Sequence, residues 1–247
     1  MSEASAVQPT PPPPPVRAWG GLLVRRCRWG LSLRGWLLAA LVALVAAGGA
    51  LRGAYPFLSI TRRVPARVLV VEGWIPQFGV RAGAAEFATG AYDYVVATGG
   101  PVPGSGVYTT EFDTSAHVVA QGLKAAGVPV ARLKKVPAHY VGRDRTFASA
   151  VALRDWLAEH DPEVRAVNIV TAEAHARRTR LLFELGLGTA FRVGIISAPN
   201  PDYDSRYWWR YSEGVREVLG ESIAYVYARC LFHPTAADAG GGTPAVH

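Results

Sequence analysis

The chain has 247 residues, half of them hydrophobic, and carries a formal net charge of +7. This length suits one large domain or two small ones, with enough apolar residues for a sizeable core. The arginines gather beside an apolar segment and form no basic run interleaved with aromatic residues, which favours anionic lipid headgroups as partners over nucleic acid. Only two cysteines, Cys27 and Cys230, are present, so neither a disulfide framework nor a zinc or other metal site is expected.

Residues 1–30 predict a disordered, proline-rich and basic arm. The stretch Pro9–Pro15 is almost entirely proline, which lacks amide donors and has a fixed φ, so polyproline II or disorder is expected. Five arginines lie between this stretch and the apolar segment: Arg17, Arg25, Arg26, Arg28 and Arg34.

Residues 31–51 predict one transmembrane helix. The uncharged stretch Gly35–Leu51 gives about 26 Å of helix against a hydrocarbon core of about 30 Å, and Arg34 can extend the span by placing its guanidinium among the headgroups. Two alternatives stay open. The segment could be a buried helix of a soluble core or a cleaved signal peptide, for which Ala46–Ala50 supplies small residues, although the long proline-rich region before it is unusual for a signal.

The arginines on either side of this segment bear on its orientation. Five precede it and four follow it (Arg52, Arg62, Arg63 and Arg67). This difference of one arginine favours, by the positive-inside rule, a cytoplasmic N-terminus and a domain outside the cytoplasm.

After a linker over residues 52–66, residues 67–233 predict a single α/β domain. Short apolar runs alternate with helical patterns, which indicates βαβ units and a mainly parallel sheet of about five strands, covered by helices on both faces in three layers. The expected strands are Arg67–Val71, Tyr92–Ala97, Arg132–Val136, Ala166–Val170 and Arg192–Ile196. The expected helices lie near Gly79–Thr89, Asp113–Ala126, Thr146–His160 and Ala174–Leu185.

A last helix is expected near Arg206–Phe232, and residues 234–247 predict a disordered tail. The charges of Glu221 and Arg229 argue against a second membrane span. Its apolar residues at helical spacing favour a stripe packed on the body, and a helix lying against the membrane surface is the alternative. The residues of the expected stripe are Trp208, Tyr211, Val215, Val218, Leu219, Ser222 and Val226.

Polar or glycine-rich segments follow the predicted strands, at the edge where a parallel sheet binds ligands. The first contains Glu72 and Gly73, and the second runs from Thr98 through Gly99 and Gly100 to Glu111. Glycines in such a loop permit positive φ and let backbone amides approach an anion, but a flexible connection explains them equally well.

The other two segments carry the basic residues. Asp144 or Thr146 can cap the helix that follows, and Arg145 with Arg143 could hold an anion near its positive end, although capping alone needs no ligand. In the last segment Thr171, His175 and Arg178 share one face of a helix start, with Arg177 beside them. His175 could act as a general acid or base, or donate a hydrogen bond to an oxyanion.

Taken together, these segments resemble the SanA/ElyC/YdcF-like family, a domain family of unknown function. The resemblance is carried by VLVVEGW (Val68–Trp74), VVATGG (Val95–Gly100), Glu111, GVP (Gly127–Pro129), DRTFASA (Asp144–Ala150) and VTAEAHARR (Val170–Arg178). It implies a Rossmann-like domain, often membrane-anchored, that is linked to the bacterial envelope and to peptidoglycan or carrier-lipid metabolism. One branch looks like a binder of S-adenosylmethionine. This chain departs from the family pattern at Glu72, Arg143, Arg145 and Ala148, where the family often has a glycine and a Ser-x-Asn-Thr-x-Glu-Asn motif.

Three functions follow from these features. The first is an envelope protein that binds a lipid-linked phosphate or nucleotide-like ligand, with acid/base or polar contacts from Glu72, Glu111 and His175. Its anion contacts would come from Arg145, Arg177 and Arg178. The second is a non-catalytic membrane-tethered scaffold or regulator that recruits a partner through Trp208 and Trp209. The third is a cytosol-facing enzyme that uses S-adenosylmethionine. If the first is an enzyme, phosphoryl or glycosyl-phosphate chemistry fits best.

Overall fold

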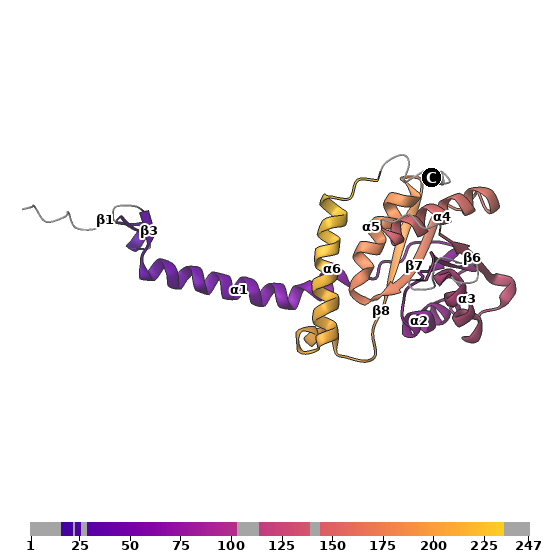
Figure 1. The fold of residues 1–247 in the computed structure, drawn as a ribbon, viewed down its shortest axis with the longest axis horizontal. Helices are drawn as coiled ribbons and strands as arrows, with labels where there is room; N and C mark the ends of the chain where they lie inside the picture. Colours follow the sequence, from indigo (N-terminus) through magenta and orange to yellow (C-terminus); the bar gives the residue numbers. More distant parts are fainter. Residues whose placement is uncertain (1–15, 22, 26–28, 103–113, 139–143, 235–247) are drawn as a thin grey trace, which may run out of the picture. The chain divides into compact units, whose positions relative to one another are not determined.

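The computed structural model describes residues 16–21, 23–25, 29–102, 114–138 and 144–234. The chain divides into two compact units, Met1–Leu51 and Arg52–His247 (Figure 1). The second unit is the α/β domain that the sequence predicts.

The first unit begins with a small antiparallel sheet. Its strands are β1 (Val16–Ala18), β2 (Leu23–Arg25) and β3 (Trp29–Leu31), in the order β1-β2-β3, and a short 3-10 helix, η1 (Trp19–Gly21), joins the first two. In the connection between β1 and β2, Trp19 and Gly20 both have positive φ. The predicted arm covers residues 1–30. The described residues among them, 16–21, 23–25 and 29–30, form this sheet and turn, whereas residues 1–15, to which the proline argument applies, lie outside the described residues.

Helix α1 (Leu33–Leu58) has 26 residues, or about 39 Å, and is long and apolar enough to cross a membrane. It runs seven residues beyond the predicted end at Leu51, so the first half of the predicted linker is helical. Packing explains the difference, because Leu58 at the end of α1 is 1% exposed in the core of the second unit. Tertiary contacts, which local sequence patterns do not encode, extend the helix past Arg52.

The rest of the predicted linker also belongs to the domain. Arg62 exchanges two backbone hydrogen bonds with Ile195, on the outer edge of the sheet. The buried side chain of Asn168 accepts a hydrogen bond from the Val64 amide and donates one to the Val64 carbonyl, both at 2.9 Å. A Cβ at Gly194 would lie 1.9 Å from the Asn168 oxygen, so only glycine leaves room for this contact.

The domain is built on a five-stranded sheet in which every strand is parallel to its neighbours. Its strands, in the order β6-β5-β4-β7-β8, are β4 (Val68–Val71), β5 (Tyr94–Gly99), β6 (Leu133–Pro137), β7 (Ala166–Ala172) and β8 (Arg192–Ala198). All five lie where the sequence predicts a strand. The chain runs outward from β4 through β5 to β6, then returns to the other side of β4, so the strand order reverses between β4 and β7. In open α/β sheets such a switch point is where ligands bind.

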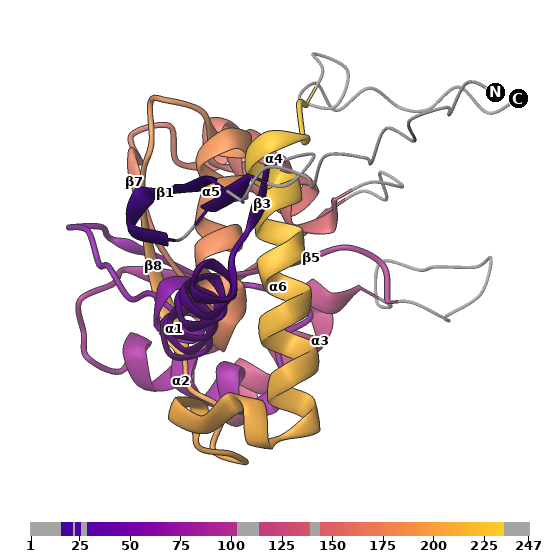
Figure 2. The same cartoon turned by 90° about the vertical axis from the view of Figure 1, so that its left-hand side faces the viewer.

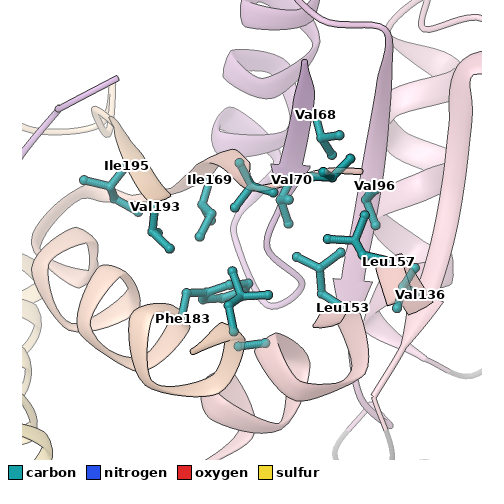
Figure 3. Close-up of a cluster of buried hydrophobic side chains, with 14 of the residues drawn as sticks. Val68, Val70, Val96, Val136, Leu153, Leu157, Ile169, Phe183, Val193 and Ile195 are labelled. Carbon is teal, nitrogen blue, oxygen red and sulfur yellow. The ribbon is translucent and has the colours of Figure 1, made fainter. Parts of the chain in front are cut away.

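Helices cover both faces of the sheet, which makes the fold a three-layer, Rossmann-like α/β domain. Side chains of α2 (Gln77–Phe87) and α3 (Ser115–Ala125) share one buried cluster with one face of the strands. Those of α4 (Arg145–His160) and α5 (Ala176–Leu187) share the other, around Leu153 and Phe183 (Figure 3). Since both faces are covered, all four residues of β4 are buried and its sequence shows no polar alternation.

The described residues of the domain also form three 3-10 helices, η3 (Val130–Arg132), η4 (Glu173–His175) and η5 (Ser205–Arg210). The long helix α6 (Ser212–Cys230) follows them (Figure 2). The predicted apolar stripe of the last helix is only partly confirmed. Trp208 and Val218 are buried, but Leu219 and Val226 are more than half exposed. The face that α6 turns toward the body carries Gly214, Val218 and Ala228 instead.

The core cluster predicts a contrast within one helix. Phe183→Ala removes a fully buried ring and should lower the free energy of unfolding by about 3–5 kcal/mol, whereas Leu185→Ala, at a side chain 42% exposed, should change it by about 0.5 kcal/mol. Denaturant unfolding of the full chain in detergent, followed by near-UV circular dichroism, measures both. Equal losses for the two variants would contradict the placement of α5.

Candidate functional site

A buried carboxylate marks the switch point between β4 and β7. Glu72 directly follows β4, and its amide donates a hydrogen bond to the carbonyl of Val170 on β7. The side chain is 2% exposed, so its charge must be matched by donors inside the protein.

Hydroxyl groups from three elements surround that carboxylate. Thr146, in the first turn of α4, donates a hydrogen bond to Oε1 at 2.9 Å. Thr171 on β7 and Thr179 on α5 donate to Oε2 at 2.6 and 2.9 Å. Glu72, Thr146 and Thr171 thus lie together at the carboxyl edge of the sheet, where the sequence predicts them. Thr179 is a further contact, eight residues beyond Thr171 along the chain.

His175 lies between two carboxylates. Its Nε2 is 3.4 Å from Oε1 of Glu72, and its Nδ1 is 2.9 Å from Oε1 of Glu221 on α6. Burial lowers the pKa of His175, but the two carboxylates outweigh it and raise the pKa to about 9. The raised pKa favours the imidazolium form at neutral pH, and Nη2 of Arg178 also lies 2.9 Å from Nδ1.

The two carboxylates respond in the opposite direction. Burial raises the pKa of Glu72, but the His175 imidazolium and the threonine hydroxyls outweigh it and hold the pKa below its usual value. Burial also raises the pKa of Glu221, yet hydrogen bonds from His175 and Arg178 bring it down to about 2. Both groups are thus ionised at neutral pH.

Arg178 is a counter-ion within the same cluster. Its Nε and Nη2 donate to the two oxygens of Glu221 at 2.8 and 3.0 Å, and its Nη1 is 3.8 Å from Asp144. Burial raises the pKa of Asp144 above its usual value, and the nearby positive charge of Arg178 offsets only part of this increase. The cluster therefore pairs two cations with the carboxylates of Glu72 and Glu221, and Arg178 has little capacity left for an external anion.

Backbone strain surrounds this cluster. The described residues contain four non-glycine positions with positive φ, and three of them are Trp74 (72°), Asp144 (28°) and Glu173 (36°). They follow β4, precede α4 and follow β7, respectively, which places all three at the carboxyl edge of the sheet. Each such conformation costs about 1–3 kcal/mol and persists where the surrounding structure enforces it, as at ligand sites.

The glycines of the first two segments have a packing role. A Cβ at Gly73 would lie 2.5 Å from the Thr98 carbonyl oxygen, and one at Gly99 would lie 2.8 Å from the Ser115 side chain. Gly99 also has φ of 136°, and a Cβ at Gly100 would lie 3.3 Å from the Ala138 carbonyl oxygen. Close contact between strand ends and the start of α3 therefore explains these glycines without a ligand.

Two buried polar atoms at the same edge have no hydrogen-bond partner in the part of the chain that the structure describes. They are Oγ1 of Thr98, a residue with no exposed surface, and Nε1 of Trp74. Buried polar groups almost always form a hydrogen bond. Two such atoms without one, both near Gly73, are therefore compatible with a ligand that supplies the missing hydrogen bonds.

The remaining predicted arginines behave differently from each other. Arg145 is exposed, and its guanidinium lies 4.2 Å from the ring centroid of Trp74, with no acidic partner among the described residues. Arg177 instead stacks on Phe57 of α1 at 4.0 Å and donates to the Phe57 carbonyl, so the structure does not bring it to the cluster. Glu111 and Arg143 lie outside the described residues.

A second acidic cluster was not predicted from the sequence. The buried Glu173 accepts hydrogen bonds from Tyr203 at 2.9 Å and from Tyr55 of α1 at 3.2 Å. Burial and the nearby Glu173 carboxylate raise the pKa of Glu217 on α6 to about 8. Glu217 and Glu221 are one helical turn apart beside the buried Val218. This spacing is the signal by which the sequence could have placed both carboxylates on the inner face of α6.

Among the described residues, no group of three or more histidine, cysteine, aspartate or glutamate side chains is arranged to hold a metal ion. Comparison with models of known protein families and with curated proteins finds no match. The functional argument therefore rests on the chemistry of the site itself.

The paired charges predict a distinctive titration. His175 should titrate near pH 9, and Glu72→Gln should lower its pKa toward the usual 6.5, because one of its two carboxylate partners is lost. Since its folded-state pKa is raised, the stabilisation from protonated His175 is complete below about pH 6.5 and is lost as the pH rises through about 9. NMR of labelled histidine in the full chain, with unfolding at several pH values, measures both effects.

Glu217→Gln is the matched control, because the carboxylate of α6 that pairs with His175 is Glu221. The raised pKa of Glu217 removes stability over a lower range, about pH 4.5 to 8. A His175 titration that is the same in the wild type and in Glu72→Gln would refute the proposed pairing.

Proposed function

We propose that this chain is a membrane-anchored cell-envelope protein, related to the SanA/ElyC/YdcF-like family, whose α/β domain binds an anionic, phosphate-bearing ligand. The ligand class we favour is a lipid-linked phosphate or a nucleotide-like molecule of peptidoglycan or carrier-lipid metabolism. The supporting observation is the exposed Arg145, held on Trp74 at the switch-point edge without an acidic partner among the described residues.

Neighbouring features support an anion at this place. Arg145 is the first residue of α4, where unpaired helical amides favour negative charge. The unpaired Thr98 hydroxyl is buried close by, next to Gly73. The Glu72–His175 pair lies at the same edge of the sheet, but both ring nitrogens of His175 face carboxylates, so the pair holds the edge in place and does not itself contact the ligand. Arg178 keeps this pair in place through Glu221 and is a positioning residue in the proposal.

The connection between α1 and the domain favours a ligand in or near the bilayer. Leu58 is buried in the core, and Tyr55 is hydrogen bonded to Glu173, so no free linker separates the candidate membrane helix from the domain. A site attached so closely to a membrane anchor reaches lipid headgroups more readily than distant soluble molecules.

We expect a single-pass protein with its N-terminus in the cytoplasm and its domain outside. A periplasmic alkaline phosphatase reporter fused after His247 should be active in a bacterial host, and a cytoplasmic fluorescent reporter at the same place should be dark. Carbonate extraction should leave the chain in the membrane at its full mass. An active cytoplasmic reporter would instead favour the S-adenosylmethionine hypothesis, and a shortened soluble chain would show signal cleavage.

We expect the detergent-solubilised full chain to bind a long-chain polyprenyl phosphate more tightly than the matching polyprenol. Arg145→Ala should weaken this binding about 10-fold or more, the effect of losing a charge-assisted hydrogen bond of about 1.5–3 kcal/mol. Equilibrium binding of the radiolabelled lipid measures the change, with inorganic phosphate as a competitor.

Arg177→Ala is the matched control, because Arg177 also stacks on an aromatic ring but faces α1. Equal losses in both variants, or no preference for the phosphate over the alcohol, would count against the proposed site.

A further inference from the structure

The outer face of α6 carries an apolar stripe that the domain does not cover. Leu219, Ile223 and Val226 are 52%, 72% and 57% exposed, and the exposed Cys230 continues the line. Spacings of four, three and four residues place these side chains on one side of the helix. The opposite side, with Gly214, Val218 and Ala228, is buried against the body. The helix is therefore apolar on two sides, and only one of them serves the core.

This stripe lies beside the point where α1 enters the domain. The ring of Phe57 meets that of Tyr225 on α6 edge-on, with centroids 5.6 Å apart. Ala54 and Tyr55 of α1, and Val215 and Tyr225 of α6, all pack against one buried cluster. Six residues of continuous helix, about 9 Å, separate Leu51 at the end of the uncharged stretch from Phe57. Along the chain, the uncharged stretch of α1 therefore ends six residues before a residue that contacts α6.

Charge and aromatic residues around the stripe match a lipid surface. Arg216 and Arg229 are exposed and flank the stripe on its two sides. Arg210 is exposed on η5 and lies 4.9 Å from the ring of Tyr207, which is itself 44% exposed. Helices that lie in the headgroup region of anionic membranes typically carry arginines beside apolar and tyrosine side chains.

We propose that α6 is a membrane-surface helix, with Leu219, Ile223 and Val226 inserted into the headgroup and upper acyl region of the same bilayer that α1 crosses. The flanking arginines bind anionic headgroups. This second contact holds the domain at the membrane, and the inference rests on the membrane attachment in the proposed function. Trp208 has a different role from the one expected for partner recruitment, because it is only 4% exposed and belongs to the core.

The test uses the full chain in vesicles of mixed neutral and anionic phospholipid, with Cys27 and Cys230 replaced by serine. Single nitroxide labels are attached at Ile223→Cys, at Leu44→Cys in α1, and at Lys134→Cys on β6, an exposed position at the far edge of the sheet. Collisions with oxygen, which concentrates in lipid, are compared with collisions with a water-soluble nickel complex.

We expect the label at residue 223 to favour oxygen over nickel, as the label at residue 44 does, and the label at residue 134 to show the reverse. A label at Val226→Cys should repeat the result if labelling at residue 223 disturbs the fold. A water-exposed label at residue 223, or one shielded from both reagents by a protein partner or second copy, would overturn the proposal. Lipid exposure at residue 44 in that case would leave the anchor intact, whereas water exposure at residue 44 would refute the anchor itself.

Discussion

The buried carboxylate of Glu72 is the interaction on which the carboxyl edge of the sheet depends. A charge with 2% exposure is tolerated only if donors replace the water it has lost. Those donors come from α4, β7, η4 and α5, so one side chain joins both sides of the switch point between β4 and β7. The strained backbone at Trp74, Asp144 and Glu173 lies around the same centre, where these contacts hold it.

This arrangement separates the basic residues of the edge by role. The charges of His175 and Arg178 are matched by Glu72 and Glu221, so both cations stabilise the site from within. Arg177 is turned toward α1. Among the described residues of this edge, Arg145 is the cation that remains exposed, which is why the proposed anion contact rests on it. The distinction depends on Glu221 of α6, a helix that begins at Ser212, after the last strand has ended at Ala198.

The last residues of α1 make specific contacts within the domain. Glu173 binds Tyr55 of α1 through one oxygen and Tyr203 through the other, and Leu58 fills the adjoining core cluster. Because Glu173 lies two residues before His175, the end of α1 and the candidate site share one short segment of chain. The geometry of the end of α1 and that of the site are therefore set together.

The sequence by itself determined the elements of the domain and their class. Apolar strands without polar alternation, separated by helical patterns, predict a parallel sheet covered on both faces, and each of the five strands and four covering helices lies where the pattern placed it. The reason is that a strand buried on both faces is apolar along its whole length, and this pattern can be read directly from the sequence. The same reasoning brought Glu72, Thr146, Thr171, His175 and Arg178 to one edge, because parallel strands end together.

Only the tertiary structure decided the partners of these residues. Glu221, Glu217 and Tyr203 lie far along the chain, and nothing local marks them as the groups that neutralise Arg178 and His175 or surround Glu173. Likewise, α1 extends to Leu58, and residues 59–66 join the sheet edge, because of contacts with Glu173, Asn168 and Ile195 that are more than a hundred residues away. Local patterns record which side chains must be buried, whereas charge pairing depends on which distant surfaces meet, and that is fixed only when the chain has folded.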